Sequence, residues 1–222
     1  KETVTGVFRD FLGALDEREA AEALYRLPAA DGSEGVAIDS AIQCCYCVLD
    51  MEKSGFEGRH LPFIQALGDL YTTPLMRFQK GAYGAASSAS LSRGLVIHYT
   101  YSDPNVAETL DVFAGSPEFL ETVQINREEL DGYILNMFGA VTAPSGMLAD
   151  VLADLYRVVE GTDLAARADF INDIKNAQLS DQADAAAALK KGMTEFSTTV
   201  TAGNEEKLRA AKDRFPRIIS YR

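Results

Sequence analysis

The chain has 222 residues, 47% of them hydrophobic, and carries a formal net charge of -12 at pH 7. This acidic balance disfavours nucleic-acid binding, which needs a basic face that displaces counterions from phosphates. No apolar run approaches the roughly 20 residues that cross a bilayer, and the first residues lack the apolar core of a signal peptide. We therefore expect a soluble protein of a bacterial cytoplasm that binds neither nucleic acid nor a membrane.

Hydrophobic periodicity predicts both helices and strands in the first half of the chain. We expect helices over residues 7–27 and 62–71, and strands over residues 36–38, 42–49 and 95–101. The last strand is the clearest, because its residues alternate so that one face carries Leu95, Ile97, Tyr99 and Tyr101. The run from Tyr83 to Ser92 is dominated by small residues and is not assigned to an element.

The second half of the chain is mostly helical. We expect helices over residues 104–113, 117–120, 127–138, 148–159, 164–176, 181–191 and 205–214, and one strand over residues 196–200. Asp103 is expected to cap the first of these helices, and Gly161 to end the helix at 148–159. Strands followed by helices favour an α+β fold over alternating βαβ units. No repeat or long linker appears, so we expect residues 1–222 to form one domain.

All three cysteines fall in the run Cys44-Cys45-Tyr46-Cys47. Alternation along a strand would place Cys45 and Cys47 on one face and Cys44 on the other. A soft-metal site would need a second cluster of Cys and His to complete a tetrahedron of ligands, and the sequence does not contain one. We therefore expect buried cysteines that act as small hydrophobic residues in a reducing compartment.

The most informative run in the chain is Arg77-Phe78-Gln79-Lys80-Gly81-Ala82-Tyr83-Gly84. Cleavage of a peptide bond develops negative charge on the carbonyl oxygen, and a fixed phenol O–H or guanidinium stabilises that charge. Arg77 offers a planar, permanently charged fork, and Tyr83 offers a neutral donor. Glycines on either side of Tyr83 would let a peptide backbone come close. Arg77 and Tyr83 are therefore suited by their chemistry to holding a peptide.

The same run resembles the C-terminal half of the pitrilysin/insulinase-type inverted-zincin metallopeptidases. The likeness is strongest to the presequence protease branch, in which an Arg precedes a Gly-Ala-Tyr-Gly loop. Further matches follow the family order at Glu34 to Ile38, Tyr101-Ser102-Asp103-Pro104 and Asn126 to Leu130. Lys80 departs from the pattern, because the family commonly has a second Gly there, and it makes the loop bulkier.

The resemblance implies an α+β sandwich in which helices cover one face of a mainly antiparallel sheet, as in these metallopeptidases and LuxS-like proteins. It also implies that Tyr83 stabilises the oxyanion or the substrate carbonyl, and that the peptide is held by Arg77, Gly81, Ala82 and Gly84. The substrates would be unfolded peptides. They would be enclosed by a partner, the N-terminal zinc-bearing half of the same protein or a separate subunit.

The sequence lacks the His-x-x-Glu-His motif with which these enzymes bind zinc and activate water. Its two histidines are His60, expected in a loop, and His98, expected as a structural residue on a strand. We therefore expect no metal site in this chain, zinc in the other half, and no peptidase activity from this chain alone. It would be a C-terminal fragment of a longer peptidase.

Two other hypotheses remain open. A non-catalytic binding or assembly subunit with the same fold would retain or lose this Arg and Tyr without any zinc chemistry. An unrelated α+β enzyme would use neither residue, and a buried Tyr83 would support it. For an isolated Arg and Tyr at this spacing, the ordinary expectation is that Arg77 pairs with a surface carboxylate and Tyr83 packs on its strand.

Overall fold

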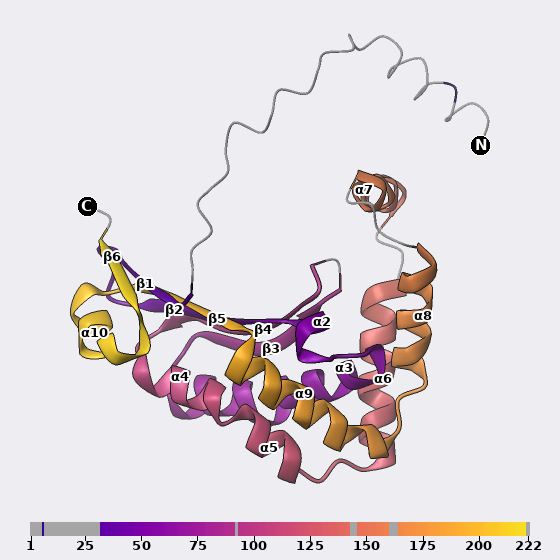
Figure 1. Ribbon diagram of the computed structural model, residues 1–222, viewed down its shortest axis with the longest axis horizontal. Coiled ribbons are helices and arrows are strands. Elements are labelled where there is room, and N and C mark those ends of the chain that lie inside the picture. The colour runs from indigo at the N-terminus through magenta and orange to yellow at the C-terminus, as the bar shows by residue number, and fades with distance from the viewer. Residues whose placement is uncertain (1–5, 7–31, 92, 143–145, 160–163, 221–222) are drawn as a thin grey trace. The chain divides into compact units, whose positions relative to one another are not determined.

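The computed structural model describes Gly6 and residues 32–91, 93–142, 146–159 and 164–220 (Figure 1). The chain divides into two compact units, Lys1–Asp31 and Gly32–Arg222, and every element below belongs to the second unit. The helices expected over residues 7–27 and the cap expected at Gly161 lie outside the described residues. The arrangement of residues 1–222 as one domain stays a prediction.

A six-stranded sheet with the order β3-β4-β2-β5-β1-β6 forms the centre of the fold. Its strands are β1 Glu34–Ala37, β2 Gln43–Asp50, β3 Gly84–Ser90, β4 Leu95–Asp103, β5 Ser197–Gly203 and β6 Arg217–Ser220. Neighbours from β3 to β5 pair antiparallel, whereas β1 runs parallel to both β5 and β6. The expected α+β class with a mainly antiparallel sheet is confirmed, and β1 makes the sheet mixed.

Two strands were not predicted, and the more important one is β3. It contains only Gly, Ala and Ser, so it has none of the β-branched or aromatic residues that mark strands in a sequence. Long-range pairing with β4 holds it in place, from Gly84 opposite Tyr101 to Ser90 opposite Leu95. The other missed strand, β6, has only four residues. Both assignments depend on distant partners that local periodicity does not contain.

Apart from the short helix α2, which was not predicted, the described helices follow the predicted order with shifted boundaries. They are α2 Met51–Ser54, α3 Leu61–Leu67, α4 Ala107–Ala114, α5 Ser116–Thr122, α6 Arg127–Thr142, α7 Met147–Val159, α8 Leu164–Lys175, α9 Gln182–Glu195 and α10 Glu205–Ala210. Short 3₁₀ turns lie at Gly58–His60, Leu179–Asp181 and Lys212–Arg214. The helix expected over residues 62–71 runs further, because α3 continues into the π-helical segments η2 Gly68–Thr72 and η3 Pro74–Gln79.

The core lies between the sheet and the helices on one of its faces. Helices α3, α4, α5 and α9 lie on that face, and the opposite face carries no helix among the described elements (Figure 1). Strand β4 alternates as expected, with Val96, His98 and Thr100 buried on the helical face. The face formed by Leu95, Ile97, Tyr99 and Tyr101 therefore looks away from the helices. We call it the open face.

The cysteines follow the expected alternation on β2. Cys45 and Cys47 are buried on the helical face, and Cys44 is half-buried on the open face. Burial raises the pKa of the Cys45 and Cys47 thiols to about 11, so both stay protonated near neutral pH. This is the behaviour of core residues and not of a reactive thiol.

Helix α7 exposes most of its apolar side chains. The exposed side chains include Met147, Leu148, Val151, Leu152 and Leu155. The apolar stripe predicted over residues 148–159 is therefore present, but these five side chains are not packed in the core. Within the described part of the chain no single helix has the length and composition of a membrane span, although the bent pair Arg127–Thr142 and Met147–Arg157 reaches them together.

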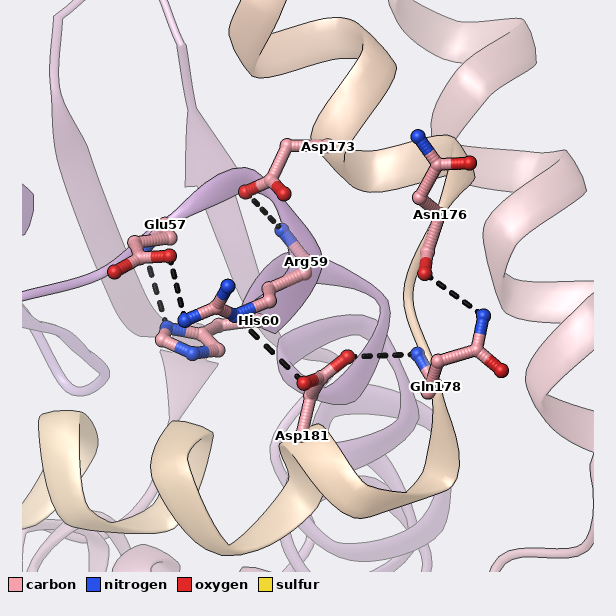
Figure 2. Close-up of polar contacts among 7 residues, drawn as sticks. All are labelled: Glu57, Arg59, His60, Asp173, Asn176, Gln178 and Asp181. Carbon is pink, nitrogen blue, oxygen red and sulfur yellow. Dashed lines mark hydrogen bonds and ion pairs between the residues drawn. The ribbon is translucent and has the colours of Figure 1, made fainter.

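A polar cluster fastens the turn Gly58–His60 to the C-terminal half of the chain (Figure 2). The backbone N–H of Arg59 donates to Asp173 on α8 at 3.0 Å, and the Arg59 guanidinium lies 3.7 Å from Asp181 before α9. His60, expected in a loop, lies in this 3₁₀ turn, where it is buried and accepts the Glu57 N–H through Nδ1 at 3.1 Å. The cluster joins segments more than 110 residues apart in sequence.

His98 ends a chain of buried hydrogen bonds beneath the sheet. Thr72 Oγ1 lies 2.6 Å from Ser87 Oγ, which lies 2.7 Å from His98 Nδ1. The imidazole stacks on Phe113, and Nε2 has no partner among the described residues. Burial lowers the pKa of His98 to about 4, because the charged ring would lose its hydration. His98 is thus a structural residue, as expected.

We predict that His98 makes the domain less stable in acid. Unfolding returns the His98 pKa to about 6.5, so below that pH the unfolded chain binds a proton that the folded chain accepts only near pH 4. The free energy of unfolding should therefore fall by about 3 kcal/mol from this residue between pH 7 and pH 4. Urea unfolding at several pH values measures the loss.

The matched variant is His98→Asn, which keeps a polar side chain beside Ser87 but does not titrate. Its free energy of unfolding should depend less steeply on pH over the same window, even where its stability is lower throughout. His60, whose pKa is also lowered by burial, is present in both proteins and contributes equally. Equal slopes in the two proteins would contradict the assignment.

Candidate functional site

Arg77 and Tyr83 lie at one end of the edge strand β3. Arg77 is carried by η3, Tyr83 immediately precedes β3, and residues 80–82 turn the chain between them. Both side chains line a single cavity of about 350 Å³, whose other walls are Gly84, Ala85, Tyr99 and Tyr101. The fold therefore brings together the two residues singled out in the sequence.

Both side chains are available to a ligand. Tyr83 is 68% exposed, and its ring meets Tyr101 edge-on at 5.6 Å between centroids. Arg77 is exposed, with its guanidinium carbon 5.7 Å from the Phe78 ring centroid. In the described part of the chain no carboxylate pairs with Arg77 and no hydrogen bond engages the Tyr83 phenol. Arg77 therefore does not pair with a described carboxylate, and Tyr83 is not buried.

The turn between the two residues is fixed by backbone hydrogen bonds. Lys80 N–H donates to Leu75 O at 3.0 Å, and Ala82 N–H donates to Met76 O at 2.9 Å. Gly81 has a φ of +82°, in the left-handed region that favours glycine. Gly81, which was expected to let a peptide backbone come close, is therefore needed for the turn that follows η3.

Gly84 and Ala82 serve packing. A Cβ on Gly84 would lie 1.9 Å from Tyr101 Cε1, so the tyrosine ring occupies the space above that glycine. Ala82 is 4% exposed and packs with Met76, Ala85 and Val112. The Ala82 methyl group therefore faces the interior, and neither Ala82 nor Gly81 is among the residues that line the cavity.

Asp103 anchors the same turn from the far end of β4. Its buried carboxylate accepts the Asn105 N–H at 2.8 Å and the Thr109 hydroxyl at 2.7 Å. The prediction that Asp103 is a helix N-cap is wrong, because α4 begins only at Ala107 and has no side-chain cap. Asn105 in turn donates to Lys80 O at 2.9 Å. Sequence reasoning missed this role, although Asp-x-Asn spacing is typical of such local turns.

Strand β3 forms one edge of the sheet. It pairs only with β4, and Tyr83 N–H donates to Ser102 O at 3.2 Å. In an antiparallel pair the backbone groups alternate in direction. Asp50 N–H donates to Phe196 O on the β5 side and Met51 N–H donates to Gly94 O on the β4 side, and this alternation makes the N–H and C=O of Ala85, Ser87 and Ala89 point away from β4. One of these groups, Ala85 O, accepts the Thr73 hydroxyl at 2.9 Å. On the open face Gly84, Ala86 and Ser88 are small and lie opposite large β4 residues such as Tyr101 and Tyr99. At this edge of the sheet the small side chains of β3 therefore lie beside the larger side chains of β4.

The described residues contain no group of three or more His, Cys, Asp or Glu side chains that could hold a metal ion. His60 and His98 each use Nδ1 in a local hydrogen bond. The site therefore offers hydrogen-bond donors beside the edge strand β3. Among the described residues it offers no set of metal ligands.

A model of the PreP C-terminal domain family matches residues 56–204, more than half of the chain. The chain belongs to the presequence protease C-terminal domain family. Its relatives include the mitochondrial presequence protease of Danio rerio, 32% identical over 97 residues that cover 39% of this chain and 9% of that protein. Protein HypA of Clostridium perfringens is 29% identical over 157 residues, 69% of this chain and 16% of that protein. The chain thus spans less than a fifth of these curated relatives.

The fold of this PreP C-terminal domain is shared with a solved peptidase. A protease from Helicobacter pylori matches with a TM-score of 0.59 at 20% identity, covering 91% of this chain and 52% of that chain. Identity at this level shows the fold alone. The family resemblance inferred from the sequence is confirmed, and the range matched by the family model includes Arg77, Tyr83 and Asn105.

We predict that Gly84→Ala destabilises the PreP domain through a clash with Tyr101. The added methyl would overlap the ring, since its position lies 1.9 Å from Tyr101 Cε1. Overpacking of this kind costs about 1–3 kcal/mol. Urea unfolding of the variant and the wild type measures the difference.

Repeating Gly84→Ala in a Tyr101→Ser background isolates the cause. With the ring gone, the added methyl should cost little, because the two changes remove one shared contact. The same loss in both backgrounds would show that the clash with Tyr101 is not the reason.

Proposed function

We propose that this domain is the substrate-binding, zinc-free half of a zinc-dependent peptidase that degrades unfolded peptides. The observation that carries the proposal is one cavity lined by both Arg77 and Tyr83 beside the edge strand β3. Both side chains are exposed, and neither has a polar side-chain partner among the described residues. Membership of the presequence protease C-terminal family supports the same conclusion.

The edge strand suits an extended peptide. A peptide that adds a strand to β3 gains main-chain hydrogen bonds from those outward backbone groups of β3 that Thr73 does not already occupy, independent of its sequence. Its side chains on the open face would lie over the small residues of β3. In this arrangement Arg77 orients the peptide by its carbonyl groups, and Tyr83 donates to the oxyanion that develops during cleavage.

The zinc and its activated water would come from a companion half. In the Helicobacter pylori protease the matching region is 52% of a longer chain, which supports a fold unit accompanied by a second one. The open face of the sheet is the surface that a companion would cover. We therefore propose that the N-terminal zinc-bearing half, in the same polypeptide or in a partner subunit, closes over Arg77 and Tyr83.

We predict that Tyr83→Phe lowers turnover in the assembled peptidase, with its zinc-bearing half present. Loss of one oxyanion donor should reduce kcat by up to about 100-fold. Folding should be spared, because the Tyr83 side chain is 68% exposed and the variant keeps the ring. Steady-state kinetics on an unstructured peptide gives kcat and KM separately.

Tyr46→Phe is the matched control for Tyr83→Phe. Tyr46 is 41% exposed on the open face and stacks on Tyr99, but it does not line the cavity with Arg77. The control should keep the wild-type kcat. Unchanged turnover in Tyr83→Phe would remove this phenol from the mechanism.

We also predict that this chain alone binds unstructured peptides but does not cleave them, even with zinc in excess. Mass spectrometry of a peptide mixture after incubation with the chain and zinc would show intact peptides only. Metal-dependent cleavage by the chain alone would overturn the division into a binding half and a zinc half. If the companion also lacks a zinc motif, the same edge serves a binding or assembly subunit instead.

A further inference from the structure

The turn between Arg77 and Tyr83 accepts a hydrogen bond from a side-chain amide further along the chain, that of Asn105. Asn105 Nδ2 donates to the carbonyl oxygen of Lys80 at 2.9 Å across 25 residues of sequence. Lys80 is the residue at which η3 ends, and the last carbonyls of a helix have no partner within the helix. Asn105 therefore satisfies a carbonyl at the point where the chain changes direction.

Asn105 is itself held rigidly by a buried acid. The Asp103 carboxylate accepts both the Asn105 backbone N–H at 2.8 Å and the Asn105 Nδ2 at 3.2 Å. Thr109 binds the second carboxylate oxygen at 2.7 Å, and Gln43 Nε2 donates to Asp103 O at 2.9 Å. Asp103, Thr109 and Gln43 are all fully buried. The amide that reaches Lys80 thus extends from a fixed network in the sheet.

This contact lies where it controls the geometry of the site. Arg77 stands on a helical segment and Tyr83 at the start of a strand, so their relative orientation depends on the turn at residues 80–82. Lys80 also pairs through its Nζ with Glu108 at 2.8 Å, but that ion pair is on the surface and is held by a flexible stem. The bond from Asn105 acts on the backbone itself.

We infer that Asn105 is a positioning residue, which holds the turn at Lys80 so that Arg77 and Tyr83 face the same cavity. The inference rests on the proposed function for its effect on peptides, but not for its effect on the turn. Asp103 supports it by orienting the amide. Loss of the amide leaves the sheet and the helices in place and loosens the connection between the two ligand-binding side chains.

The experiment compares Asn105→Ala with Gln182→Ala. Gln182 is a matched control, because its side-chain amide also donates to backbone carbonyls, those of Leu120 and Val123 at 2.9 and 2.8 Å, away from the cavity. Both variants lose hydrogen bonds donated by one side-chain amide to backbone carbonyls. Only Asn105→Ala should raise amide hydrogen exchange at Ala82 and Tyr83, by about tenfold.

Peptide binding gives the second readout. The anisotropy of a fluorescein-labelled unstructured peptide of about 20 residues should report about tenfold weaker binding to Asn105→Ala and unchanged binding to Gln182→Ala. In a Tyr83→Ala background the further loss from Asn105→Ala should shrink, because the two residues act through one geometry. If Asn105 served only the overall stability of the fold, the losses of peptide binding from Asn105→Ala and Tyr83→Ala would add.

The outcomes separate the two proposals. If Tyr83→Ala itself leaves peptide binding unchanged, the proposed function fails, and exchange at Ala82 and Tyr83 alone decides whether Asn105 holds the turn. If Tyr83→Ala weakens binding while Asn105→Ala matches Gln182→Ala in both measurements, the role of Asn105 is overturned. Should Asn105→Ala not fold, Asn105→Ser keeps the backbone bond to Asp103, loses the reach to Lys80, and is judged by the same criteria.

Discussion

The close packing of β3 between a helix and an aromatic ring is the constraint on which the site depends. Below the strand, a Cβ on Gly68 would lie 2.7 Å from the Ser87 carbonyl oxygen. Above it, the Tyr101 ring fills the space over Gly84. A strand made of larger residues would push both layers apart. At the start of this strand the short turn at residues 80–82 joins η3 to β3, and Arg77 and Tyr83 on either side of the turn line one cavity.

The small residues that make this packing possible also explain what the sequence could and could not predict. Residues 95–101 and 127–138 were assigned correctly, because alternation and helical spacing are local patterns. Strand β3 carries no local signal, and its structure comes from β4. Arg77 and Tyr83 were chosen from a family resemblance and from their chemistry. That they share a cavity follows only from the pairing of distant strands.

The role of Asp103 shows a second limit of sequence reasoning. An Asp ahead of Pro104 and a helical pattern has the ordinary signature of a helix cap. In the fold the carboxylate is fully buried, where it must satisfy its oxygens with donors of its own surroundings. It does so through Asn105 and Thr109, and the helix starts later, at Ala107. The role of Asp103 therefore depends on its burial in the folded protein, which the local sequence does not reveal.

The residues on the open face of the sheet indicate whether the domain acts alone. A sheet that faces water normally carries polar residues at its outward positions. Here the central strands instead place Tyr46 against Tyr99, stacked at 5.8 Å, and Val48 opposite Ile97 on that face. Aromatic and aliphatic surface of this kind, next to the cavity that holds Arg77 and Tyr83, is typical of an interaction surface. A companion that covers it would exclude water from the cavity as well, and exclusion of water is the condition under which a phenol and a guanidinium stabilise a developing charge most strongly.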